Sequence, residues 1–330
     1  MNRVAGNGMA GQGVKNMKIA ITGGTGFVGR HLAQFLISLG HQPVLLARGR
    51  DRRHAPVAPL IPTDLSHPAS LAEAIRGCEA IAHCAGINRE TGAQTYQRIH
   101  IEGTRNLIEA ARTAAVPRIL MLSFLRARPG CGSPYHESKF QAEELIRQSG
   151  LDYTILKAGM IYGRGDHMLD HLSHTLFTLP LFATVGWGEQ PIRPVAIDDM
   201  TRIITAALTA GRLSRRTAFV LGPETLLLSE AVRRVAATLN RRVLILPAPV
   251  VFHRHLAAVC ERTMAIPLVA RAQVQMLAEG FLEPAPAADA LPHDLQPQLR
   301  FTPEQIRQGL PDPGPFTCAD LRLSLCSHGG

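Results

Sequence analysis

A single stretch near the start of the chain constrains its fold more than any other. Residues 18–22 read KIAIT, the apolar and β-branched pattern of a buried strand, and apolar side chains then recur at helical spacing from Phe27 to Leu39, before Gly40. Glycines 23, 26 and 29 lie at this junction. A strand, a glycine turn and a helix in this order predict a corner where a pyrophosphate can approach the backbone and meet the unpaired N–H groups of the helix N-terminus.

This corner predicts dinucleotide binding. We expect the coenzyme to contact the turn and the first helical residues, which are Gly23, Thr25, Gly26, Phe27, Val28 and Gly29. Gly29 also lets the helix pack closely on the strand. The competing interpretation is a glycine-rich turn without a ligand, and the strand before it and the helix after it favour the binding site.

Strands and helices alternate through most of the chain. Strands are predicted within QPVLLARGRDRRH, APLIPTDLSHP, CEAIAHCAGIN, RILMLS and LDYTILKAGMIYGRGD, with amphipathic helices over residues 69–78 and 96–116 between them. This alternation predicts an α/β fold with a doubly wound parallel sheet of the Rossmann type. The later segments TAFVLG, LLSEAVRRVAATLN and RRVLILP predict a smaller α/β C-terminal substrate domain.

The same patterns divide the chain into four parts. Residues 1–16 are rich in glycine and predict a disordered N-terminal extension, in which case Met17 is a candidate natural start. Residues 17–165 form the predicted coenzyme domain. Residues 166–310 form mainly a substrate or cap domain, with 190–222 returning to the coenzyme domain, where Asp198 or Asp199 is expected to cap a helix. Residues 311–330 are expected to be a loose tail.

The ends of the second, third and fourth predicted strands suggest how the coenzyme is recognised. The second strand ends at Arg48, with Arg50, Arg52 and Arg53 behind it, where an NAD site would place an acidic residue. Because a guanidinium binds a 2′-phosphate, we predict a preference for NADP(H), with NAD(H) possible and a solvated basic loop as the competing interpretation. Adenine is expected beside Asp64 and Leu65, and the small residues Ala85 and Gly86 allow close backbone approach.

The charge and the cysteine content of the chain restrict the kinds of ligand and the compartment that we expect. Lys and Arg exceed Asp and Glu by 35 − 26 = 9, but no basic stripe with interleaved aromatic rings is present, so we expect a small-molecule substrate rather than nucleic acid. Six cysteines show no metal-ligand spacing, and His167, His171 and His174 lack an evident carboxylate or cysteine partner, so no metal site is expected. Unpaired thiols favour a cytoplasmic protein.

The segment YHESKF places Tyr135 and Lys139 four residues apart, on one face of a predicted helix. With TGGTGFVG, TDLSHPASLAEAIRGCEAIAHCAG, IEGTRNLIEAAR, YHESKFQAEELIRQSGLDYTILKAGMIYG and RPVAIDDM, this segment resembles the short-chain dehydrogenase/reductase superfamily in its extended or atypical, epimerase/dehydratase-like branch. Within that branch the chain looks most like the group that contains the nucleotide-binding accessory subunit of respiratory complex I and its bacterial relatives.

The resemblance implies catalytic roles for three residues. Tyr135 would exchange a proton with a substrate hydroxyl or carbonyl while hydride moves to or from the nicotinamide. Lys139 would lower the pKa of that phenol and hold the nicotinamide ribose, and Ser123 would hold the substrate oxygen. Phe124 and Leu125 follow Ser123, where the family would allow a hydroxyl.

Two functions therefore stay open. One is an NAD(P)(H)-dependent reductase, epimerase or dehydratase. The other is a catalytically weak or inactive nucleotide-binding accessory protein, associated with a respiratory or other complex and peripheral to a membrane.

Overall fold

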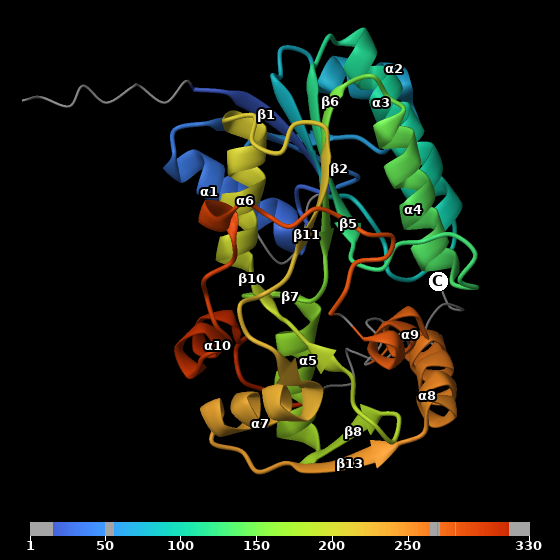
Figure 1. The fold of residues 1–330 in the computed structure, drawn as a ribbon, viewed down its shortest axis with the longest axis vertical. Coiled ribbons are helices and arrows are strands. Elements are labelled where there is room, and N and C mark those ends of the chain that lie inside the picture. The colour runs from blue at the N-terminus through green and yellow to red at the C-terminus, as the bar shows by residue number, and fades with distance from the viewer. Residues whose placement is uncertain (1–15, 50–55, 265–268, 270, 281, 317–330) are drawn as a thin grey trace, which may run out of the picture.

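The computed structural model describes residues 16–49, 56–264, 269, 271–280 and 282–316. The predicted N-terminal extension and most of the predicted tail lie outside these residues, as do Arg50, Arg52 and Arg53. Figure 1 shows a larger lobe built on a sheet and a smaller lobe below it, with α8 and α9 at its lower right.

The larger lobe is built on a seven-stranded sheet in the order β11-β6-β5-β4-β1-β2-β3. Every pairing in this sheet is parallel. The strands are β1 (Lys18–Thr22), β2 (Gln42–Ala47), β3 (Leu60–Pro62), β4 (Ala80–His83), β5 (Arg118–Phe124), β6 (Asp152–Ala158) and β11 (Arg216–Val220). Because the chain runs from β1 outward to β3 and then returns to β4 on the other side, the sheet is doubly wound, which confirms the predicted fold class.

Helices cover both faces of this sheet. The helices are α1 (Phe27–Ser38), α2 (Pro68–Ala74), the π-helix η1 (Gln97–Glu102), α3 (Gly103–Thr113), α4 (Pro134–Arg147) and α6 (Ile197–Thr209). One apolar core joins α1 and α6 to one face, and a second joins α2, α3 and α4 to the other. A sheet buried on both sides explains why its central strands are almost continuously apolar.

The smaller lobe has its own apolar core, which includes Leu172, Val232 and Phe301. Its main elements are α5 (His167–Thr178), β8 (Leu181–Val185), α7 (Leu228–Thr238), β13 (Leu244–Ala248), α8 (Val250–Thr263), α9 (Arg271–Glu279) and α10 (Pro303–Gly309). Short elements complete the described chain: β7 (Ile161–Tyr162), β9 (Pro191–Ile192), β10 (Val195–Ala196), β12 (Leu226–Leu227) and η2 (His293–Leu295). The strands β8 and β13 pair in parallel.

The cap of α6 differs from the prediction. Ala196, in extended conformation, precedes the helix, and both Asp198 and Asp199 lie inside its first turn. The Asp199 carboxylate instead accepts hydrogen bonds at 2.8 Å from the backbone N–H groups of Gln298 and Leu299. A local helix-start pattern could not reveal this role, because the donors are about a hundred residues away.

None of the described helices is long and apolar enough to span a bilayer.

Candidate functional site

The glycine turn after β1 is pressed against the segment that follows β4. Gly23 has φ +68°, and its carbonyl oxygen accepts a hydrogen bond of 2.9 Å from the N–H of Gly26. A Cβ on Gly23 would lie 2.9 Å from the Cα of Ala85. A side chain at position 23 would therefore force the two segments apart, which explains why glycine is needed there.

Gly29 fits the start of α1 against the same turn. A Cβ on it would collide with the Gly23 carbonyl oxygen and would lie 2.9 Å from the Cα of Gly24. Gly26 caps the helix in an extended conformation, and no side chain of the described residues caps the helix or places a carboxylate in its first turn. Thr25, Phe27 and Val28 belong to this corner as predicted. The first N–H groups of α1 are thus available to an anionic ligand.

Helix α4 carries Tyr135 and Lys139 and begins at Pro134, after an extended Ser133. The Lys139 ammonium reaches the segment after β4, since a Cβ on Gly86 would lie 2.9 Å from the Lys139 Nζ. Lys139 is buried, and burial lowers its pKa to about 8 against the opposing effects of Glu143 and Cys84. The structure therefore brings the lysine, Gly86 and, through Ala85, the glycine turn to one end of the sheet.

The Tyr135 ring lies among four aromatic or imidazole rings. The ring centroids of Tyr96, His100, Phe124 and His136 are 5.6–5.8 Å from the Tyr135 centroid. Burial raises the pKa of the Tyr135 phenol above its ordinary value, with the neighbouring Tyr96 adding to the effect. In this structure the pKa thus moves away from the direction that Lys139 was expected to impose.

His100 is a site residue that the sequence did not reveal. Its Nε2 accepts a hydrogen bond of 3.1 Å from the Ile87 N–H, so the proton belongs on Nδ1, which lies 2.8 Å from the Ser138 Oγ. The Ser138 hydroxyl in turn donates to the Tyr135 carbonyl oxygen at 2.9 Å. Burial and the nearby Lys139 ammonium lower the pKa of His100 to about 2, which keeps the ring neutral. His100 lies in the π-helix, and no spacing relates it to Tyr135.

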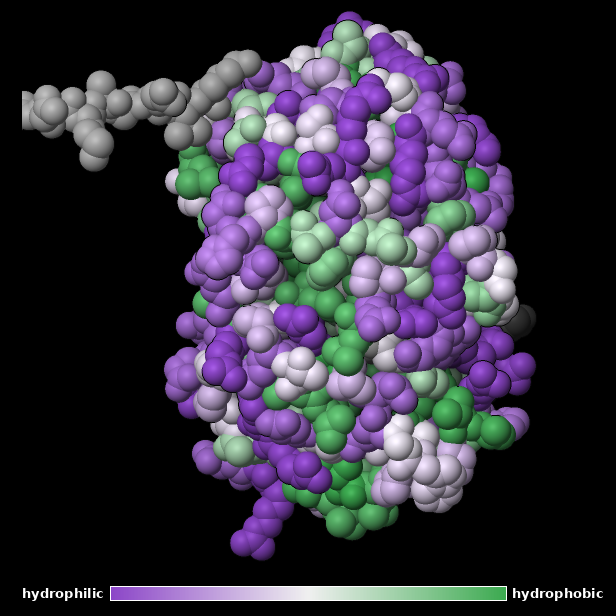
Figure 2. Space-filling model, viewed as in Figure 1, coloured by the Kyte–Doolittle hydropathy of each residue, from purple (hydrophilic) through white to green (hydrophobic). Residues whose placement is uncertain are grey.

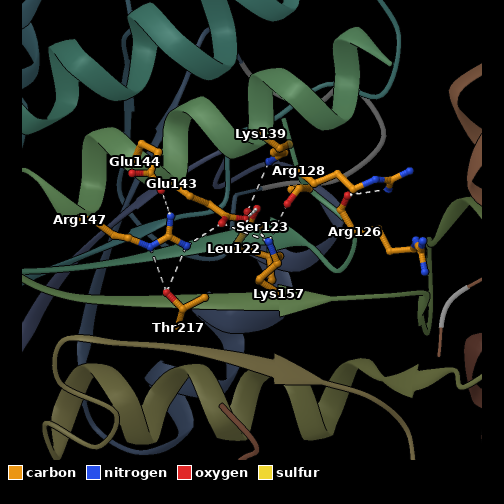
Figure 3. Close-up of polar contacts among 11 residues, drawn as sticks. Leu122, Ser123, Arg126, Arg128, Lys139, Glu143, Glu144, Arg147, Lys157 and Thr217 are labelled. Atoms are coloured by element: carbon orange, nitrogen blue, oxygen red, sulfur yellow. Dashed lines mark hydrogen bonds and ion pairs between the residues drawn. The ribbon is translucent and has the colours of Figure 1, made fainter. Parts of the chain in front are cut away.

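Ser123 is directed elsewhere. Its hydroxyl donates a 2.6 Å hydrogen bond to the buried Glu143 carboxylate on α4, and the Lys157 ammonium of β6 lies 2.9 Å from the same oxygen (Figure 3). Arg147 binds the other Glu143 oxygen at 2.8 Å and contacts Thr217 of β11. The ring of Phe124, rather than the hydroxyl of Ser123, faces Tyr135. The buried pair of Glu143 and Lys157 also went unnoticed in the sequence, because nothing local indicates that β6 crosses beneath α4.

The predicted adenine end lies at the same edge of the sheet. Arg48 follows β2 and is exposed. The Asp64 carboxylate accepts a 2.8 Å hydrogen bond from the Ser66 N–H, which lowers its pKa, and the Leu65 side chain packs on Gly103. The Leu65 carbonyl oxygen accepts a 2.7 Å hydrogen bond from the Asn106 side chain.

Helix α5 carries the three histidines that the sequence singled out. The rings of His167 and His171 are in contact, and His174 lies 2.7 Å from the Asp170 carbonyl oxygen. In the described part of the chain no group of three or more His, Cys, Asp or Glu side chains is placed to hold a metal.

Comparison with known proteins shows what this chain is similar to. Residues 23–171 match the model of a family described as NAD(P)H-binding. A ceramide reductase of Caulobacter vibrioides is 35% identical over 156 residues, 45% of this chain and 47% of its own. The mitochondrial 40 kDa subunit of the NADH-ubiquinone oxidoreductase of Neurospora crassa is 22% identical over 77% of this chain and 69% of its own.

Some relatives are much longer than the matched part. An uncharacterized protein of Mycobacterium tuberculosis is 27% identical over 71% of this chain but only 24% of its own length. Among solved structures, the UDP-glucose 4-epimerase of Thermus thermophilus in complex with NAD superposes with a TM-score of 0.64 at 20% identity, covering 88% of this chain and 97% of that one. The likeness to solved structures confirms the predicted fold. The family match over residues 23–171 agrees with the expected resemblance to proteins that bind NAD(P)H.

Proposed function

We propose that this chain is an NAD(P)(H)-dependent enzyme of the short-chain dehydrogenase/reductase superfamily. The match of residues 23–171 to an NAD(P)H-binding family and the likeness in fold to a UDP-glucose 4-epimerase support this proposal. The enzyme acts on a hydroxyl or carbonyl substrate, as a reductase, epimerase or dehydratase. In this assignment residues 17–165 bind the coenzyme, and residues 166–310 cap the substrate, apart from 190–222.

The observation that carries the proposal is the position of Lys139. Its ammonium lies against Gly86, in the segment after β4 whose Ala85 lies close to Gly23 of the glycine turn. A coenzyme whose pyrophosphate lies on the N-terminus of α1 would have its nicotinamide ribose within reach of that ammonium. When bound, the nicotinamide supplies or accepts the hydride, and Tyr135, on the same helix face as Lys139, supplies or accepts the proton.

The protonation state of the Tyr135 phenol indicates the direction of the proposed reaction. Its pKa is raised by burial and not lowered by a neighbouring cation, so the neutral phenol is the ground state. A neutral phenol is suited to donate a proton, which favours carbonyl reduction. His100 remains neutral and holds the first turn of α4 through Ser138, which fixes the Tyr135 backbone.

The test is turnover by purified full-length chain with a panel of carbonyl substrates, followed as loss of NADPH or NADH absorbance. We expect Tyr135→Phe to lower kcat by about a hundredfold or more. The Tyr153→Phe variant, on β6, is the matched control and should keep full activity. Undiminished turnover of Tyr135→Phe would refute the catalytic role.

A second candidate is a nucleotide-binding accessory protein with weak or no turnover. It is favoured by Ser123, whose hydroxyl is held by Glu143, and by Phe124, which takes the place beside Tyr135. The Neurospora relative is by name a subunit of a mitochondrial NADH-ubiquinone oxidoreductase. Tight binding of coenzyme without turnover on any carbonyl substrate, together with recovery in a stable complex with other proteins, would select this candidate.

A further inference from the structure

Helix α8 exposes a strip of apolar side chains next to its buried face. His253, Ala257 and Cys260 are buried, while Phe252, Leu256 and Val259 recur at i, i+4 and i+7 on an exposed face. Phe252 is 52% exposed and Val259 57% exposed. Contiguous apolar side chains exposed along one helix face indicate an interaction site.

Trp187 extends this strip beyond the start of the helix. The Gly186 N–H donates a 2.8 Å hydrogen bond to the Ala248 carbonyl oxygen, and a Cβ on Gly186 would lie 3.8 Å from the Val250 side chain. Trp187 therefore emerges beside the first turn of α8, and it is 77% exposed. We call Trp187, Val251, Phe252, Leu256 and Val259 the α8 surface.

The strand that leads into α8 adds apolar area. Leu244 and Leu246 of β13 are both exposed and lie two residues apart on one face of the strand. In Figure 2 a green patch lies at the lower end of the molecule, beside pale and purple residues, where Figure 1 places β8 and β13.

Basic side chains are exposed on α8, and His255 and Arg262 lie next to the apolar strip. Arg254, His255 and Arg262 are exposed on the helix, and among the described residues neither arginine forms an ion pair. Glu261 is the one acidic residue of α8, and it is paired with Arg271 of α9 at 2.9 Å. Because the only negative charge of the helix is neutralised, its exposed surface carries a net positive charge.

We propose that the α8 surface binds the face of an anionic lipid bilayer. Aromatic and aliphatic side chains on one helix face, with arginines on the rest of its exposed surface, are the features of helices that lie in the bilayer interface. The helical strip spans a rise of seven residues, about 10 Å along the axis, which is narrow for a stable protein interface of about 800 Å² per partner. This inference does not depend on the proposed reaction.

The test uses Trp187, the only tryptophan of the chain, as a built-in probe. Full-length protein is titrated with vesicles of phosphatidylcholine alone and with vesicles containing phosphatidylglycerol, at low and high salt. We expect a blue shift of tryptophan emission and co-flotation with the anionic vesicles, both weakened by salt and by removal of the anionic lipid.

Variants separate the α8 surface from the rest of the molecule. Phe252→Ser/Val259→Ser should weaken binding to anionic vesicles by at least about tenfold. Ile37→Ser/Leu39→Ser, which removes two comparably exposed apolar side chains at the end of α1, should bind like the parent protein. Circular dichroism and coenzyme binding confirm that each variant is folded.

Three results would overturn the proposal. The first is an unshifted emission spectrum with anionic vesicles, and the second is equal binding by parent and Phe252→Ser/Val259→Ser. The third is a blue shift that depends on protein concentration without vesicles, which would identify a second copy of the chain as the occupant.

Discussion

The buried charges beneath α4 allow a quantitative prediction. The side chain of Glu143 is 0% exposed and that of Lys157 is 1% exposed, and the Lys157 Nζ lies 2.9 and 3.1 Å from the two carboxylate oxygens. Removing one partner of such a pair destabilises a protein by about 3–5 kcal/mol, because the other charge stays buried and unpaired. We therefore expect Lys157→Met and Glu143→Leu each to lower the free energy of unfolding substantially.

The remaining contacts decide where each variant falls in that range. In Lys157→Met, Glu143 keeps its hydrogen bonds with Ser123 and Arg147, so we expect a loss of about 3 kcal/mol. In Glu143→Leu, Lys157 keeps the Ala127 carbonyl oxygen, and burial already lowers its pKa. Because Lys157 can then release its proton and become neutral, we expect the free energy of unfolding to fall by about as much as in Lys157→Met.

The double variant Glu143→Leu/Lys157→Met is the decisive measurement. It removes both charges together, so no buried charge is left unpaired and two side chains of similar volume fill the space. We expect a loss of about 1–2 kcal/mol, far below the sum of the single losses. Urea unfolding followed by circular dichroism measures all three, and Arg76→Met, at the exposed pair with Glu73, serves as a control with little expected effect. Additive single and double losses would refute the account.

Three further predictions concern the coenzyme site. Gly29→Ala, whose new Cβ would collide with the Gly23 carbonyl oxygen, should abolish detectable coenzyme binding by calorimetry, while Gly188→Ala, in open space, should not. Arg48→Glu should weaken NADPH binding by about tenfold or more and leave NADH binding nearly unchanged, whereas equal effects on both would argue against a 2′-phosphate contact. Because burial lowers the pKa of Lys139 to about 8, the coenzyme-free folded chain binds fewer protons than the unfolded chain between pH 8 and about 10. Its free energy of unfolding should therefore rise across that window, and urea titrations should show a smaller rise for Lys139→Met.

The sequence alone determined the fold class and the glycine turn between β1 and α1. Strand, turn and helix are read from local patterns, and the requirement for glycine at 29 comes from backbone distances within one strand-turn-helix unit. The close approach that requires glycine at 23 is to Ala85, which the sheet brings next to the turn. The parallel sheet followed because strands alternated with helices of sufficient length. The four-residue spacing of Tyr135 and Lys139 predicted that they share one helix face, and the family resemblance implied their roles.

Only the tertiary structure decided which groups surround that pair. Tyr96, His100 and Phe124 reach Tyr135 from two other elements, and the order in which strands enter the sheet sets which side chains meet. The direction of the Ser123 hydroxyl depended on Glu143, twenty residues away on another element. The pKa of Tyr135 likewise depends on burial, a sum over distant neighbours that no local pattern contains.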